Sequence, residues 1–299
     1  MRRPEASGLR GGDADGLDLI ETAYAKVNLA LHVRKRRPDG YHTLESLFVF
    51  ARDGDRIAGR VTSDGGIALT LDGPFGNALD GGPGNLVVRA ARALQDHLGE
   101  TRGAAMTLTK NLPVASGIGG GSADAAAALR LLLRLWDAQV PEAELEQIAL
   151  GLGSDVPACL SSATQMVQGR GEHLERRVID GLAHRPMLLV NPGVAVSTAT
   201  IFKGWDRIDR GALIAENLDD LIGGGRNDLE PSAIAVAPVI SAVLARLRTC
   251  DGVRLARMSG SGATCFALFD AQERRTAAAN ALRTERPDWW VMETEIRAA

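Results

Sequence analysis

The chain of 299 residues is long for one hydrophobic core and predicts two domains of ordinary size. Apolar residues make up 45% and charged residues 24%, as in soluble globular proteins, and the net charge of −3 excludes a general attraction for nucleic acid or anionic lipid. The three cysteines fit no zinc spacing and indicate a reducing compartment. We expect a cytoplasmic protein with neither nucleic acid nor membrane as partner.

The first ordered element is predicted to be a strand. Residues 1–18 are polar and glycine-rich, lack the apolar core of a secretory signal, and predict a disordered tail. Residues 22–33 alternate between apolar and polar, which predicts a strand with Lys26 and Asn28 on one face. Pro-Asp-Gly at 38–40 predicts a tight turn, and 42–50 the returning strand.

The rest of the chain mixes helical and strand patterns without strict alternation. Helices are expected at 85–98, 122–136, 141–153, 231–248 and 271–285. Further strands are expected at 56–62, 67–72, 105–113 and 186–191, on both sides of a turn within 252–269, and at 289–296. The pattern restarts near residue 180. We therefore predict an α+β chain with domains at 19–180 and 181–299.

A glycine-rich loop precedes the helix expected at 122–136. Gly117, Gly119, Gly120 and Gly121 crowd into five positions, so the loop is either a tight turn into a buried helix or a site where backbone N–H groups face an anion. No lysine precedes Ser122, which excludes a Walker A loop. Ser122 also stands where a Rossmann fingerprint has its last glycine. A protein-kinase lid is not followed by a helix.

Three segments resemble the signatures of the GHMP kinases. The loop and helix start, PVASGIGGGSADAAA from Pro113, are similar to the second signature. AYAKVNLALHV at 23–33 resembles the first, and MSGSGATCFALF at 258–269 the third, whose turn at Gly260, Ser261 and Gly262 closes over the phosphate site. The resemblance implies an N-terminal ATP-binding domain, a C-terminal ferredoxin-like α/β-sandwich domain and an active site in the cleft between them.

Finer segments resemble one family of these kinases. Residues 25–48, 152–160, 191–202 and 227–231 are similar, in order, to segments of 4-diphosphocytidyl-2-C-methyl-D-erythritol kinases. The resemblance implies transfer of the ATP γ-phosphoryl group to the 2-hydroxyl of a substrate with a cytidine diphosphate head, with Mg²⁺, in isoprenoid-precursor synthesis. Two alternatives stay open: a GHMP kinase for another small alcohol, and a non-catalytic sugar or nucleotide sensor. The protein is expected to be a monomer or a weak homodimer.

The resemblance assigns the catalytic pair to Lys26 and Asp155. Asp155 would take the proton of the substrate hydroxyl, and Lys26 would stabilise the charge nearby, which is the pair of groups that this chemistry needs. Taken alone, Asp155 is equally compatible with capping a short helix, and Lys26 with a solvated position on a strand.

The resemblance also assigns the ligand contacts. Tyr41 and Phe202 would hold the cytosine ring between them, His42 would read its edge, and Asn28 and Thr198 would contact the rest of the substrate. The expected ATP contacts are Pro113, Val114, Ala115, Ser116, Gly117, Ile118, Gly119, Gly120, Gly121, Ser122 and Ala123, with Asn85 and Lys110 near the adenine.

Two of these positions have an alternative reading. Asn85 is equally compatible with capping the helix at 85–98. Ser122 is expected to bind a phosphate or Mg²⁺, or to cap its own helix. Asp124 follows as an expected partner of the helix dipole.

Overall fold

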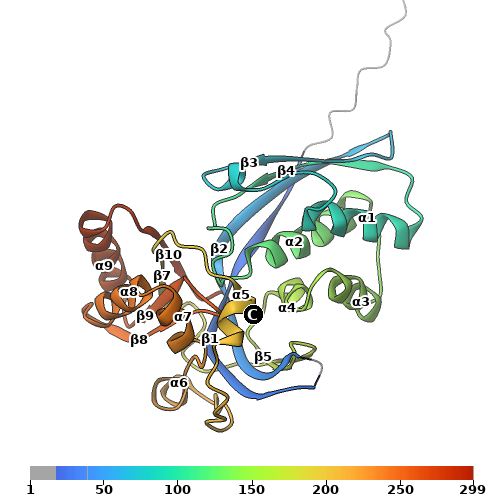
Figure 1. The fold of residues 1–299 in the computed structure, drawn as a ribbon. Helices are drawn as coiled ribbons and strands as arrows, with labels where there is room; N and C mark the ends of the chain where they lie inside the picture. Colours follow the sequence, from blue (N-terminus) through green and yellow to red (C-terminus); the bar gives the residue numbers. More distant parts are fainter. Residues whose placement is uncertain (1–17, 39, 299) are drawn as a thin grey trace, which may run out of the picture.

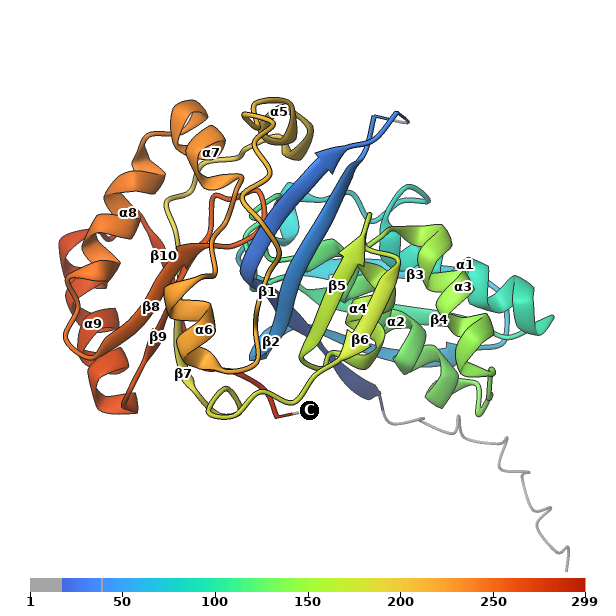
Figure 2. The same ribbon diagram turned by 90° about the horizontal axis from the view of Figure 1, so that it is seen from below.

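The computed structural model describes residues 18–38 and 40–298, so the expected tail lies almost wholly outside the described residues. Two sheets lie side by side, and each carries helices on the face turned away from the other (Figures 1 and 2). The first sheet has six strands and the second has four. Strands and helices do not alternate strictly, as expected for an α+β chain.

The first sheet runs in the order β3-β4-β2-β5-β6, and β1 pairs with β2. Its strands are β1 (Leu19–Arg36), β2 (His42–Thr62), β3 (Ile67–Asp72), β4 (Gly103–Thr109), β5 (Gln165–Gly169) and β6 (His173–Arg176). Its helices are α1 (Leu86–Leu98), α2 (Gly120–Leu135), α3 (Glu142–Leu152) and α4 (Val156–Ser161). The alanine run of α2 is fully buried, which lets this helix pack closely on β1 and β2.

The second sheet runs in the order β10-β7-β9-β8. Its strands are β7 (Pro186–Asn191), β8 (Val253–Met258), β9 (Cys265–Phe269) and β10 (Trp290–Glu295). The helices of this half are α5 (Thr198–Lys203), α6 (Leu218–Gly223), α7 (Glu230–Val236), α8 (Val239–Arg248) and α9 (Gln272–Glu285). The expected boundary near residue 180 falls in the connection between β6 and β7, and the exact bounds of the two domains, 19–180 and 181–299, stay a prediction.

An apolar layer fills the space between the two sheets. Along β7, Leu188 and Val190 pack with α8 and α9, whereas Leu189 packs toward the first sheet. Leu29 of β1 and Phe266 of β9 belong to the same buried layer as Leu189. Because alternate residues of one strand serve two cores, the central strands are apolar on both faces.

The β1–β2 hairpin carries irregularities that the sequence pattern does not reveal. The register of β1 against β2 shifts between Tyr24 and Lys26 and between Asn28 and Ala30, so the strict alternation expected for 22–33 is broken by bulges. Lys26 and Asn28 still share a face, since their side chains are hydrogen-bonded to each other. The bulged region is also where the functional side chains lie.

Several element boundaries differ from those expected. The strands expected at 42–50 and 56–62 form one continuous strand, β2. The helix expected at 231–248 is two helices, because Pro238 interrupts it. The helix expected at 122–136 spans Gly120–Leu135, and its N-cap is Gly119, so the alternative in which Ser122 caps this helix is wrong. No helix within the described residues is both long and apolar enough to span a membrane.

Candidate active site

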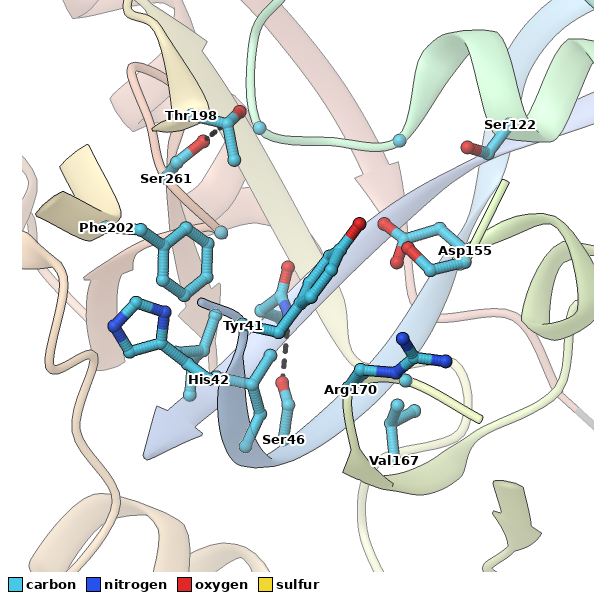
Figure 3. A pocket seen from close by; sticks show the side chains of 18 of the residues that line it. Tyr41, His42, Ser46, Ser122, Asp155, Val167, Arg170, Thr198, Phe202 and Ser261 are labelled. Carbon is cyan, nitrogen blue, oxygen red and sulfur yellow. Dashed lines mark hydrogen bonds between the residues drawn. The ribbon is translucent and has the colours of Figure 1, made fainter. Parts of the chain in front are cut away.

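A cleft of about 1270 Å³ opens where the two halves of the protein meet. The β1–β2 hairpin, the glycine loop before α2, the start of α4, and α5 all contribute to its wall. Figure 3 shows Tyr41, Phe202, Asp155 and Ser122 pointing into it from these separate elements. The cleft is large enough for two ligands of nucleotide size to lie end to end.

Bare backbone lines the cleft at the start of α2. Gly117, with φ +78°, and Gly119, with φ +64°, adopt left-handed conformations that favour glycine. Gly119 is the N-cap, so the N–H groups of the first helical turn lack acceptors within the helix, and the helix end contributes roughly half a positive charge. Gly120, Gly121 and Ser122 of this turn line the cleft. The arrangement suits an anion such as a phosphate.

The turn at 259–262 packs directly on the glycine loop. A Cβ added to Gly117 would lie 2.5 Å from the carbonyl oxygen of Ser259, which leaves no room for a side chain. Thr264 donates its backbone N–H to the carbonyl of Ser116 at 3.1 Å. Asn227 donates its side-chain amide to the carbonyls of Met258 and Gly260, each at 2.8 Å. The second and third motifs therefore form one continuous surface.

Lys26 and Asp155 form an ion pair on the floor of the cleft. The distance from Lys26 Nζ to Asp155 Oδ2 is 3.2 Å, and their side chains are 6% and 34% exposed. Asp155 is the N-cap residue of α4, but its side chain makes no capping hydrogen bond. Its carboxylate is thus turned toward the lysine rather than toward its own helix. A half-exposed carboxylate beside a buried cation can accept a proton from a bound alcohol.

The neighbours of Lys26 fix its orientation. Its ammonium donates to Asn28 Oδ1 at 2.9 Å and lies 4.4 Å from the centre of the Phe48 ring. Asn28 in turn donates its amide to Ser46 Oγ at 2.9 Å, a bond marked by the dashed line at Ser46 in Figure 3. The backbone N–H of Lys26 donates to Ile118 O of the glycine loop at 3.0 Å. The ammonium of Lys26 is therefore held at a fixed position relative to the glycine loop.

Aromatic side chains form the opposite end of the cleft. The rings of His42 and Phe202 lie 5.2 Å apart, and Trp205 meets His42 edge-on at 5.6 Å. Tyr41 is 60% exposed, and the guanidinium of Arg170 lies 5.1 Å from its ring centre. Burial, with a smaller effect of Arg36, lowers the pKa of His42 below its ordinary value of 6.5, so its imidazole is neutral at neutral pH.

The charges around the cleft favour anionic ligands. Five basic side chains and two carboxylates line it. The basic residues are Lys26, Arg36, Arg170, Lys203 and Arg207, and the acidic residues are Asp155 and Glu172. A surplus of positive charge in a concave site raises the local concentration of phosphorylated ligands.

The residues near the glycine loop fit a Mg²⁺ ion that arrives on a nucleotide. The described residues contain no cluster of three or more His, Cys, Asp or Glu side chains able to hold a metal ion by themselves. Ser122 offers one hydroxyl in the first turn of α2, on the cleft wall. Mg²⁺ commonly takes one or two protein ligands and completes its shell with phosphates and water.

Comparisons with known proteins agree with this geometry. The family model of the GHMP kinases N-terminal domain matches residues 85–163, and that of the C-terminal domain matches 208–288. A 4-diphosphocytidyl-2-C-methyl-D-erythritol kinase of Rhizorhabdus wittichii is 50% identical over 279 residues, which cover 93% of this chain and 94% of the relative. That of Novosphingobium aromaticivorans is 46% identical and covers 98% and 99%. The chain belongs to the 4-diphosphocytidyl-2-C-methyl-D-erythritol kinase family.

Solved structures place this family member among the GHMP kinases. A crystal structure of 4-(cytidine 5'-diphospho)-2C-methyl-D-erythritol kinase superposes with a TM-score of 0.79 at 32% identity, covering 94% of this chain and 100% of the other. Homoserine kinase from Cytophaga hutchinsonii has a TM-score of 0.72 at 19% identity, covers 96% and 98%, and shares the fold. The expected two-domain GHMP kinase fold is therefore confirmed.

Most of the site residues expected for this family lie together. Lys26, Asp155, Asn28, Tyr41, His42, Thr198, Phe202, Gly260, Ser261 and the loop residues Ala115, Ser116, Gly117, Gly119, Gly120, Gly121 and Ser122 line one cleft. Thr198 Oγ1 and Ser261 Oγ are 3.0 Å apart, which links α5 to the third motif (Figure 3). The proximity agrees with the expected roles, which stay predictions.

The other expected residues lie outside the lining of the cleft. They are Asn85, Lys110, Pro113, Val114, Ile118, Ala123 and Gly262. Asn85 caps α1, because its side chain accepts the N–H of Val87 at 2.9 Å and donates to the carbonyl of Asp80. Lys110 is buried between two carboxylates. Contact of these two residues with adenine stays a prediction.

Sequence reasoning did not find four side chains of this site. Ser46 positions Asn28, Phe48 lies under Lys26, Arg170 lies on Tyr41, and Trp205 lies on His42. Ser46 and Phe48 are in the returning strand, where the period of two already placed them on one face. Arg170 stands between two glycines in the β5–β6 turn, a pattern that signals a turn but not a function.

Proposed function

We propose that this protein transfers the γ-phosphoryl group of ATP to the 2-hydroxyl of 4-diphosphocytidyl-2-C-methyl-D-erythritol, a step in the synthesis of isoprenoid precursors. The observation that carries this proposal is the Lys26–Asp155 pair, 3.2 Å apart, which lies in one cleft with the glycine loop and the aromatic wall. A phosphate site, a proton acceptor and an aromatic base site are the three parts that such a reaction needs.

Asp155 takes the proton of the attacking hydroxyl. The substrate oxygen forms a bond to the γ-phosphorus as the bond between the γ-phosphorus and the bridging oxygen breaks, and ADP leaves with the electron pair. Lys26 stabilises the carboxylate before the transfer and the negative charge that develops beside it. Asn28 holds the ammonium in place through the hydrogen bond to its side-chain oxygen.

The nucleotide phosphates lie against the N–H groups of Gly120, Gly121 and Ser122. Mg²⁺ bound to the phosphates would neutralise part of their charge, and Ser122 is the side chain on the cleft wall that would reach it. At the other end, Tyr41 and Phe202 would stack on the cytosine ring, and the neutral imidazole of His42 would hydrogen-bond to its polar edge.

Incubation of the purified protein with ATP, Mg²⁺ and the cytidyl substrate tests the proposal. Phosphorus NMR should show ADP together with a new phosphomonoester on the 2-hydroxyl. Homoserine and mevalonate, tested in parallel, should yield no product. Phosphorylation of either control instead of the cytidyl substrate would assign the protein to another small alcohol. Binding of ATP without turnover of any of the three would favour a sensor.

A further inference from the structure

Lys110 lies buried beneath the glycine loop, between two carboxylates. Its Nζ is 2.5 Å from Asp55 Oδ2 and 2.6 Å from Asp124 Oδ2. The side chains of the three residues are at most 5% exposed. None of the three lines the cleft, so the cluster acts on a ligand only through the residues above it.

The cluster joins three segments that lead to the phosphate site. Asp55 belongs to β2, and its Oδ1 accepts the backbone N–H groups of Asn111 at 2.6 Å and Leu112 at 2.8 Å. These residues begin the chain that enters the glycine loop. Asp124 stands near the start of α2. The ammonium therefore ties the entrance of the loop to the helix that follows it.

The ammonium also lies close to the first residue of α2. A Cβ added to Gly120 would be 3.0 Å from Lys110 Nζ and 3.8 Å from Asp55 Oδ2. Gly120 is one of the residues whose backbone faces the cleft. Any charge on the cluster is thus separated from a bound phosphate by little more than one layer of backbone, in surroundings where charges interact strongly.

One cation between two carboxylates would leave a net negative charge if both carboxylates were ionised. Asp124 Oδ1 is buried and has no hydrogen-bond partner among the described residues. Burial is the main cause that raises the pKa of Asp124 to about 8, with the nearby charge of Asp55 acting in the same direction and Lys110 against it. Lys110 therefore offsets carboxylate charge beneath α2, and its removal would leave two buried carboxylates without their cation.

We propose that Lys110 is a positioning residue for the nucleotide phosphates, which, with Asp55 and Asp124, fixes the glycine loop to α2 and offsets carboxylate charge beneath the helix N-terminus. A negative charge at this place would oppose both the helix dipole and the bound phosphates. The inference rests on the proposed kinase function. It gives Lys110 a role other than contact with the adenine ring.

The first test compares the two roles of Lys110. Titration calorimetry measures binding of ATP and of inorganic triphosphate, which has no base, to the wild type and to Lys110→Met. We expect both affinities to fall by the same factor, at least about tenfold, because the loop is displaced and two carboxylates lose their cation. A loss for ATP alone would show adenine contact and overturn the proposal, as would unchanged affinity for both. Lys35→Met, on the exposed end of β1, is the control.

A rescue variant covers the case in which Lys110→Met does not fold. Lys110→Met combined with Asp124→Leu removes the cation and one carboxylate together, and leaves Asp55 with its two backbone donors. The double variant should fold and should bind inorganic triphosphate more tightly than Lys110→Met does. If Lys110→Met gives no folded protein, the double variant should still bind triphosphate with a measurable affinity. Failure of this rescue counts against the proposal. Because every readout is binding, a wild type that does not phosphorylate the cytidyl substrate would count only against the proposed function.

Discussion

Ser259 donates its side-chain hydroxyl hydrogen to the carbonyl oxygen of Gly117, with 3.0 Å between the two oxygens. Ser259 Oγ in turn accepts the backbone N–H of Asn28 at 3.1 Å. One buried hydroxyl thus joins the third motif to the glycine loop and to the strand that carries Lys26. The end of the cleft at the glycine loop is thus held by contacts between segments far apart in the chain.

Asp155→Asn should lower kcat by about 10²–10⁴-fold, the usual contribution of a positioned proton acceptor. The amide has nearly the shape of the carboxylate but does not take the proton of the alcohol. The dissociation constant for ATP should change little, since the proposed mechanism places Asp155 against the alcohol substrate and not against the nucleotide. Steady-state kinetics and calorimetry measure the two quantities.

Glu172→Gln is the matched control for Asp155→Asn, because Glu172 also lines the cleft and its carboxylate is not paired with Lys26. Its kcat should stay close to that of the wild type. Turnover of Asp155→Asn at the wild-type rate would remove Asp155 as the base.

Tyr41→Ala should raise the KM for the cytidyl substrate by about tenfold to 100-fold, since stacking on an aromatic ring contributes roughly 1–3 kcal/mol per base. Tyr41→Phe keeps the ring and should resemble the wild type. The KM for ATP should be the same in all three proteins. If Tyr41→Ala weakened ATP and the cytidyl substrate equally, the aromatic wall would not be the cytosine site.

Trp205→Leu should raise the pKa of His42 toward 6.5. Burial lowers this pKa in the wild type, and the edge of the buried Trp205 ring shields the imidazole. Removal of the ring admits water and relieves the desolvation of the charged form. NMR titration of the histidine signals measures the change, with Trp290→Leu on β10 as the control.

The same shift gives His42 a defined effect on stability. The folded state binds a proton at His42 less readily than the unfolded chain, so the free energy of unfolding falls as pH drops below about 6.5 toward the lowered pKa. This loss should be smaller in Trp205→Leu than in the wild type. A pKa of His42 at or above 6.5 in the wild type would refute the packing argument.

Gly119→Ala and Gly121→Ala should have opposite effects on the stability of the protein. Gly119 has φ +64°, and an added Cβ would lie 3.0 Å from Lys26 Cε, so the variant should be less stable and should displace Lys26. Gly121 is helical, and a Cβ added to it would have Leu86 Cδ1 as its nearest neighbour, at 3.5 Å. Gly121→Ala should therefore gain up to about 1 kcal/mol in stability.

Gly121→Ala should nevertheless bind ATP less well, because Gly121 lines the cleft and the added methyl group would stand where we propose that a phosphate contacts the backbone. Its KM for ATP should rise while its thermal midpoint also rises. Thermal unfolding and steady-state kinetics check both variants. A Gly121→Ala protein with wild-type ATP affinity would argue against phosphate contact at this turn.

Local patterns predicted the parts of the site that depend on local structure. The sequence predicted the glycine loop, the strand with Lys26 and Asn28, and the tight turn before Tyr41. Glycine, proline and the alternation of apolar and polar residues determine the backbone over a few residues, so their effects are visible in a short stretch of sequence. The capping role of Asn85 was one of two readings, and the structure contains that cap. Short elements such as β5, β6 and α5 were not predicted, because none of them is long enough to show a period.

Long-range relationships were beyond the sequence pattern. The cluster of Asp55, Lys110 and Asp124 assembles three positions whose separations signal nothing on their own. The same holds for Trp205 against His42 and for Ser259 against Gly117. Such contacts arise from how the two sheets pack, and they leave no periodic pattern in the amino-acid sequence.

The apolar layer between the sheets limits how ligands can enter and leave. Leu29, Val49 and Phe266 are fully buried in it, and swinging the two halves apart would expose them to water at a cost of about 25 cal/mol for each Å² of apolar surface. A hinge motion that separates the two halves is therefore disfavoured. Exchange of substrate and product would then take place through the entrance of the cleft, which the exposed ring of Tyr41 and the short helix α5 line.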